Sequence, residues 1–164
     1  VTYNGGRYHH NDTQETPDTG TAVYDFGEVG CEWVQSSCQP RAAEKPLAEC
    51  VFYGDQGTMG IDRDSWTIYD PKGVEISKGK ASTAGTGDVT HIGNFIDAIR
   101  GDAKLNSPIG EGQKSTLMCH LGNMAYRTNT VIQCDPRTGR ISGNDAAQKL
   151  WGRDAWRPGW EVKV

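Results

Sequence analysis

The sequence has no long apolar run, and no stretch approaches the roughly 20 residues that a membrane-spanning helix needs. Basic residues are not clustered either. The formal net charge is −4, whereas nucleic-acid binding favours grouped Lys and Arg. Hydrophobic residues make up only 35% of the 164 residues, which predicts one domain with a modest core. We therefore expect no membrane span and no nucleic-acid partner.

The cysteines show none of the spacings that are typical of a zinc site. Cys31 and Cys38 lie on one expected strand with their side chains on opposite faces, so a local bridge is not expected. Free thiols that are buried as small apolar side chains fit a reducing compartment. This favours a cytoplasmic location. A periplasmic one stays open if a longer precursor carries a signal segment.

Two common catalytic motifs are also missing. No G-x-G-x-x-G separates a strand from a helix, and the glycines of TAGTGD (83–88) follow a hairpin arm, which predicts a linker and not a phosphate loop. No G-x-S-x-G elbow for a serine nucleophile is present. We therefore expect no cofactor and no metal to be bound by this chain alone.

What the sequence does have is many turns, since it contains 21 Gly and 7 Pro. Asp70-Pro71-Lys72-Gly73 is a strong turn signal between two alternating segments. Strands joined by such short turns pair antiparallel. The expected strands are 1–6, 21–27, 31–38, 48–54, 58–62, 65–70, 73–79 and 131–136.

Near residue 82 the apolar period lengthens to that of a helix. Asp88 is the expected N-cap of the first helix and Gly101 its expected stop, and a second helix is expected to begin near Ser107-Pro108. The residues expected to face inward are Ile92, Phe95, Ile96 and Ile99 in the first helix, and Leu117, Leu121 and Met124 or Ala125 in the second.

This order of elements predicts an α+β fold: an open, mostly antiparallel β-sheet with the two helices of the C-terminal half on one face or edge. We expect a single domain over 1–164. It comprises a β-sheet region (1–81), two helices (88–129), and a strand with a Trp-rich tail (130–164).

Several polar and aromatic side chains are candidates for contact with a sugar-like molecule. The alternatives are a solvated loop at 7–20, a core or subunit interface around the strand 31–38, and a satisfied core histidine in the first helix. The tryptophans of the tail are either a carbohydrate platform or anchors for the tail. The substrate-contact candidates are Asn4, Tyr8, His9, His10, Trp33, Gln35 and His91.

Residues 91–127, HIGNFIDAIRGDAKLNSPIGEGQKSTLMCHLGNMAYR, resemble the helical signature of the glucose–fructose oxidoreductase/inositol dehydrogenase (Gfo/Idh/MocA) family. FYGDQGTMGI (52–61) and VYDFGEVGCEWVQ (23–35) resemble sheet segments of the same family. The resemblance implies the C-terminal domain of an oxidoreductase, without the N-terminal Rossmann domain that binds NAD or NADP. That domain has roughly 120 residues.

In that family the open sheet walls a sugar pocket on one side and commonly packs against a second subunit on the other. The resemblance therefore implies a substrate-pocket and oligomerisation domain of an NAD(P)-dependent sugar or polyol dehydrogenase, not catalytic by itself. In the family, the second helix packs partly against the Rossmann domain, so the resemblance also implies that its outer face is uncovered in this chain. We therefore expect self-association. The alternative is a stand-alone carbohydrate-binding or structural interaction module.

The family's catalytic lysine lies in an E-K-P motif and its acid/base histidine in a D-x-x-x-H helix, both upstream of the matching region. The stretch EKPLAE (44–49) contains the first motif. It lies between two expected strands, however, and not after a Rossmann strand. We predict that Lys45 lies in a solvated loop.

Overall fold

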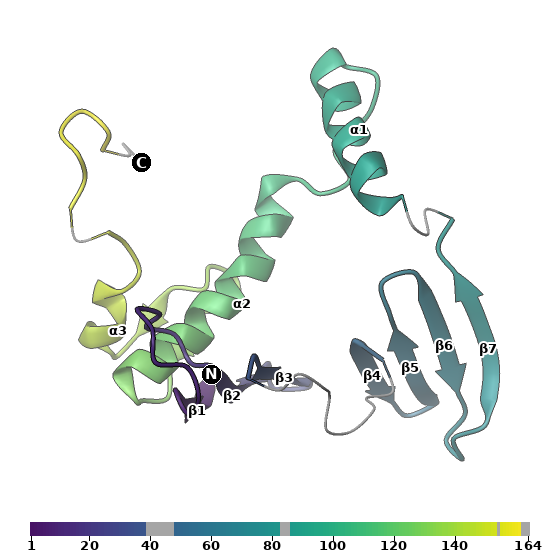
Figure 1. Cartoon of the computed structure of the whole chain (residues 1–164), viewed down its shortest axis with the longest axis horizontal. Helices are drawn as coiled ribbons and strands as arrows, with labels where there is room; N and C mark the ends of the chain where they lie inside the picture. Colours follow the sequence, from purple (N-terminus) through teal and green to yellow (C-terminus); the bar gives the residue numbers. More distant parts are fainter. Residues whose placement is uncertain (39–47, 83–85, 154, 162–164) are drawn as a thin grey trace. The chain divides into compact units, whose positions relative to one another are not determined.

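The computed structural model describes residues 1–38, 48–82, 86–153 and 155–161 (Figure 1). Contacts between residues divide the chain into two units, Val1–Pro40 with Ile109–Val164, and Arg41–Pro108. Each unit is described on its own. The single domain that we expect over 1–164 stays a prediction.

The first unit contains a three-stranded antiparallel sheet of β1 (Thr2–Gly6), β2 (Thr19–Asp25) and β3 (Gly30–Ser36), in the order β1-β2-β3. Residues directly opposite each other share a face of such a sheet. Tyr3, Ala22 and Trp33 are paired in this way, as are Gly5, Gly20 and Gln35. These residues therefore lie on one face, and Asn4 lies on the other.

Helix α2 (Ile109–Thr128) packs against the face that carries Ala22 and Tyr24. Gly122 permits the close approach, because a Cβ there would lie 3.0 Å from the Tyr24 hydroxyl and 3.4 Å from the Ala22 Cβ. The Tyr24 hydroxyl donates to the Met118 carbonyl at 2.7 Å. Burial raises the pKa of Tyr24 to about 12. Sheet and helix are thus joined by both packing and a partly buried hydrogen bond.

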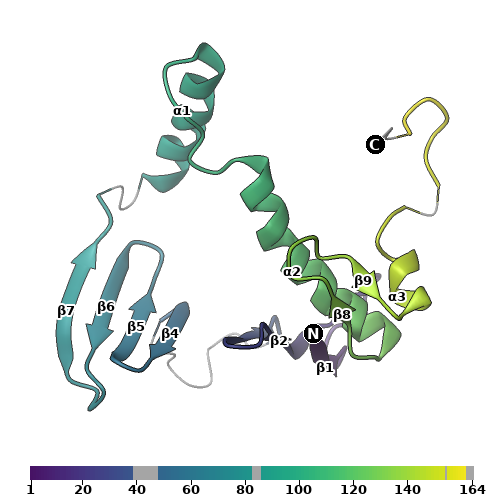
Figure 2. The same cartoon turned by 180° about the vertical axis from the view of Figure 1, so that it is seen from behind.

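The core of this unit lies between α2 and the segment that follows it. Figure 2 shows β8 (Gln133–Cys134) and β9 (Ile141–Ser142) beside α2, together with α3 (Asp145–Lys149). The Asn144 side chain caps α3 by accepting the Ala147 N–H at 3.0 Å. The buried cluster comprises Leu121, Met124, Ala125, Ile132, Ile141 and Ala147.

The second unit contains a four-stranded antiparallel meander of β4 (Cys50–Gly54), β5 (Gly57–Ile61), β6 (Ser65–Tyr69) and β7 (Glu75–Lys80). The turn between β6 and β7 is closed by a hydrogen bond from the Gly73 N–H to the Asp70 carbonyl, and Gly73 has a φ of 80°. The expected Asp-Pro-Lys-Gly turn is therefore confirmed.

Helix α1 (Gly87–Arg100) also belongs to the second unit. Gly101 ends it in the left-handed conformation, with a φ of 86°, as expected. The expected N-cap is wrong by two positions: Thr86 occupies the N-cap, and Asp88 lies inside the first turn, where its charge faces the positive end of the helix dipole.

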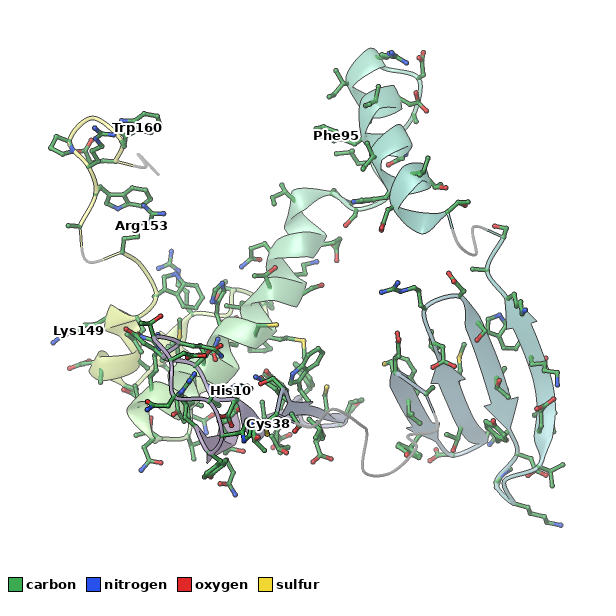
Figure 3. The ribbon with its side chains drawn as sticks, in the orientation of Figure 1. His10, Cys38, Phe95, Lys149, Arg153 and Trp160 are labelled. Atoms are coloured by element: carbon green, nitrogen blue, oxygen red, sulfur yellow. The ribbon has the colours of Figure 1, made fainter. Side chains whose placement is uncertain are left out.

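The apolar side of α1 is exposed, although a buried stripe was expected. Figure 3 shows Phe95 projecting from the helix. Helix α2 buries Leu121, Met124 and Ala125 in the core cluster, whereas Ile109 at its N-terminal end is 87% exposed. The exposed fractions are 75% for Val89, 59% for Ile92, 54% for Phe95, 42% for Ile96 and 70% for Ile99.

The α+β class, the antiparallel pairing and the two helices of the C-terminal half are confirmed. Within the described residues the strands form three sheets, β1-β2-β3, β4-β5-β6-β7 and β8-β9, and not the one open sheet that we expect from the sequence. Strand β9 and helix α3 were not expected. Lys45 and residues 83–85 of the expected linker lie outside the described residues.

Candidate functional site

The segment between β1 and β2 is held by the carboxylate of Asp18, which is only 1% exposed. Its oxygens accept the main-chain N–H groups of three successive residues, Tyr8 at 3.0 Å, His9 at 2.9 Å and His10 at 3.1 Å. These hydrogen bonds, foremost the one from His9, lower the pKa of Asp18 well below its usual range. A buried anion therefore fixes the backbone of this loop.

Arg7 complements Asp18 by binding the carbonyl groups of the same loop. Its guanidinium donates to the Thr16 carbonyl at 3.2 Å and to the His10 carbonyl at 2.8 Å. It also forms an ion pair of 2.6 Å with Asp12. Three N–H groups of the loop thus converge on an anion and two of its carbonyl groups on a cation, so these main-chain groups are paired without a sheet or a helix.

Strand β3 supports the end of the loop from the side. Gln35 donates its amide to the Pro17 carbonyl at 2.8 Å. The Ser37 N–H and hydroxyl both donate to the Asp18 carbonyl, at 2.9 Å and 3.0 Å. The Gln35 amide nitrogen, expected to be available to a substrate, is therefore engaged in positioning the loop.

The fixed backbone presents exposed rings. The Tyr8 ring is 73% exposed and lies over Gly6, where a Cβ would be 3.1 Å from the ring. The His9 and His10 rings pack edge to face, with 4.9 Å between their centroids. Figure 3 shows His10 on this loop, close to the sheet of the first unit. A fixed loop with exposed rings resembles the aromatic and polar lining of ligand sites, which provides both stacking and hydrogen bonding.

A depression of about 390 Å³ lies beside the loop, at the outer edge of β1 and the C-terminal end of α2. The Tyr3 and Tyr126 rings pack edge to face in its wall, with 5.5 Å between their centroids. Burial raises the pKa of Tyr3, and its buried hydroxyl has no hydrogen-bond partner among the described residues. The depression is lined by Tyr3, Asn4, Gly5, Tyr126, Arg127 and Asn129.

The loop and the depression are connected by an ion pair. The Arg127 guanidinium on α2 lies 2.8 Å from the carboxylate of Glu15 on the loop. Their side chains are 41% and 75% exposed, respectively, so the pair faces solvent. The loop, β1 and α2 together form one candidate site, which offers amides, a guanidinium and aromatic rings.

Besides Gln35, the candidates from the sequence lie in three places. Asn4 lines the depression, and Tyr8, His9 and His10 lie on the adjoining loop. Trp33 lies on the face of the sheet that α2 covers at Ala22, yet remains 59% exposed.

His91 is the remaining candidate. It is exposed on α1, in the second unit. Its helical neighbour Asn94 has a structural role, since the Asn94 amide donates to the Lys104 carbonyl at 2.8 Å and accepts the Asn106 N–H at 2.9 Å.

The sequence did not single out Asp18, Arg7, Glu15 or Arg127. Asp18 follows a proline in a polar stretch, which indicates a turn but not a buried carboxylate. Glu15 and Arg127 are separated by 112 positions, so no local pattern links them. Only the polar character of the loop pointed to this region.

Within the described ranges, no group of three or more His, Cys, Asp or Glu residues is placed to hold a metal ion. All five thiols are free, but the expected burial as small apolar side chains is wrong: Cys50 and Cys119 are exposed, and Cys31, Cys38 and Cys134 are half-buried. No helix in the described part of the chain is both long and apolar enough to cross a bilayer.

No protein-family model, curated protein or solved structure matches the chain.

Proposed function

We propose that this chain is the substrate-pocket and oligomerisation domain of an NAD(P)-dependent sugar or polyol dehydrogenase. The observation that carries the proposal is the loop held by Asp18, which presents Tyr8, His9 and His10 beside the depression at Asn4. Sugars are bound by planar hydrogen-bonding groups and by aromatic rings that stack on their apolar faces, and the site offers both. The resemblance of residues 91–127 to the oxidoreductase family supports the reaction class.

The cofactor is proposed to bind to a separate Rossmann domain. Every strand pair in the described ranges is antiparallel, so these residues contain no parallel βαβ unit to cradle a dinucleotide. NAD or NADP supplies the hydride chemistry of such an enzyme, and the residues described here would bind and orient the sugar. We propose the cytoplasm as the location, because the free thiols fit a reducing compartment.

Self-association is proposed to use the sheet of the second unit. Directly opposite residues place a row of apolar side chains on one face, which we call the apolar sheet face. Phe52 is 57% exposed on this face. Trp66 lies across Gly79, where a Cβ would be 2.8 Å from its ring. The face comprises Phe52, Met59, Ile61, Trp66 and Ile68.

The proposal is tested by titrating the full chain with myo-inositol, D-glucose and D-xylose, followed by amide and imidazole NMR shifts. We expect millimolar concentrations of at least one of them to shift Asn4, Tyr8, His9 and His10. His9→Ala and His10→Ala should each weaken the response, and His120→Ala, an exposed histidine on α2, should leave it unchanged. A uniform absence of shifts, or shifts confined to other residues, would contradict the proposal.

A second assay separates the proposed domain from an independent enzyme. We expect no absorbance change at the nicotinamide band when the chain is mixed with NAD⁺ or NADP⁺ and any of these polyols. Turnover by this chain alone would show that it contains a cofactor site, contrary to the proposal.

A further inference from the structure

The Arg127 guanidinium has donors to spare at the edge of the depression. Within the described part of the chain, the guanidinium makes one hydrogen bond, from a terminal nitrogen to the Glu15 carboxylate at 2.8 Å. A guanidinium presents five N–H donors in a planar fork that matches a carboxylate in a two-point arrangement. The contact with Glu15 engages only one nitrogen of this fork.

Glu15 is weakly held in its position. Its side chain is 75% exposed, and the partner in its ion pair belongs to a helix far along the chain. An exposed ion pair of this kind contributes little, because it gives up side-chain freedom in a solvent that screens the charges. A carboxylate on a ligand can therefore displace Glu15 at low cost.

We propose that the depression binds a polyhydroxy acid, an aldonic or uronic acid, whose carboxylate replaces that of Glu15 on the Arg127 guanidinium. The proposal rests on the proposed function and narrows its substrate class from sugars in general to sugar acids. Glu15 then acts as an internal competitor, which forms an ion pair with Arg127 when no ligand is bound.

The remaining lining fits the hydroxyl groups of such a ligand. Asn4 and Asn129 carry amides that both donate and accept hydrogen bonds, and the Tyr126 ring forms an apolar wall. The volume of about 390 Å³ falls at the lower end of the range for small-molecule sites, roughly 300 to 1,000 Å³, as a six-carbon acid requires. Charge, hydroxyl partners and size therefore indicate the same ligand class.

The test compares D-gluconate with D-glucitol, which differ only in that a carboxylate replaces a hydroxymethyl group. Binding to the full chain is followed by the amide shifts of Asn4, Tyr126, Arg127 and Asn129. We expect gluconate to bind several-fold more tightly than glucitol. Arg127→Gln should weaken gluconate binding about tenfold, the usual order for losing hydrogen bonds to a charged group, and should leave glucitol binding unchanged.

The decisive variant is Glu15→Gln, because it removes the internal competitor. It should strengthen gluconate binding roughly two- to five-fold, the factor that corresponds to an exposed ion pair. Glu111→Gln is the matched control: it breaks an ion pair of 2.8 Å with Lys114 on the same helix and changes the net charge equally. We expect it to leave gluconate binding unchanged.

Each other result has a defined meaning. Glucitol that binds as tightly as gluconate overturns the choice of a sugar acid and leaves the proposed function standing. Acetate that binds as tightly as gluconate indicates a plain anion site and also overturns it. If neither gluconate nor glucitol binds, this inference fails, and the proposed function fails with it only if myo-inositol, D-glucose and D-xylose also cause no shifts. Weaker gluconate binding in Glu15→Gln contradicts the role of Glu15 as a competitor.

Discussion

The carboxylate of Asp18 accepts the main-chain N–H of His9 at 2.9 Å. The same carboxylate also holds the N–H groups of the residues on either side of His9. Because Asp18 is almost fully buried, these bonds exchange little with water, and the loop that follows β1 has one defined backbone. The exposed histidine side chains therefore project from a main chain with one defined conformation.

Replacing Asp18 with Asn should release the loop. Asn has one acceptor oxygen in place of two, and its NH₂ group would face N–H groups of the main chain. We expect hydrogen exchange at Tyr8, His9 and His10 to accelerate roughly tenfold or more. Asp25→Asn changes an exposed acid of β2 that accepts the Gly27 N–H, and it should leave these amides unchanged. Equal protection of the three amides in both variants would show that Asp18 does not fix the loop.

The loop should also resist acid. A carboxyl group whose folded pKa is lowered stabilises the fold at every pH above its unfolded pKa of about 3.9. This stabilisation is lost only as the pH falls through the folded value, and the pKa of Asp18 is lowered by the three N–H donors. We therefore expect the Tyr8 amide, which donates to Asp18 at 3.0 Å, to keep its protection from hydrogen exchange from pH 7 to about pH 4. Loss of this protection between pH 6 and pH 5 would contradict a charged, hydrogen-bonded Asp18.

Gly20 should not tolerate a side chain. A Cβ at Gly20 would overlap the Tyr3 hydroxyl and lie 2.6 Å from the Tyr3 ring, which also packs edge to face with the Tyr126 ring. Gly20→Ala should lower the free energy of unfolding by about 1–3 kcal/mol, as overpacking does. Gly30→Ala, in the same sheet but with no atom within 4 Å of the added carbon, is the matched control. Urea denaturation measures both, and equal stability of the two variants would contradict the packing of Tyr3 over Gly20.

The apolar sheet face should mediate self-association. We expect the chain to sediment as a dimer or larger species at micromolar concentration, and Phe52→Lys to shift it toward the monomer, since a charge is costly in a buried interface. Tyr53→Lys is the matched control, because Tyr53 is 81% exposed and successive residues of β4 point to opposite faces. A wild-type chain that is monomeric in the ultracentrifuge would exclude this surface as an interface.

Much of the fold follows from local sequence signals. The alternation of apolar residues and the turn at Asp70–Gly73 predict β6 and β7 closely, and Gly101 predicts the end of α1. The signals failed where elements are short. Strand β9 has two residues and α3 has five, which is too few for a period to show.

The site was less accessible from the sequence, because its contacts are not local. The polar loop drew attention to Tyr8, His9 and His10, but its organising residue accepts main-chain N–H groups that no side-chain pattern reveals. Arg127 belongs to the helical signature by sequence and to the depression only in three dimensions. Gln35, an expected substrate contact, also has a structural partner that the sequence does not reveal, because its amide nitrogen donates to the Pro17 carbonyl.

The most direct test of the central claim is to determine the natural reading frame upstream of Val1, together with the intact mass of the native polypeptide. If this chain is the substrate domain of a sugar or polyol dehydrogenase, that frame continues into a strand, a G-x-G-x-x-G turn and a helix, followed by an E-K-P motif and a D-x-x-x-H helix. A start codon directly before Val1, with a native mass equal to that of this chain, would contradict the claim.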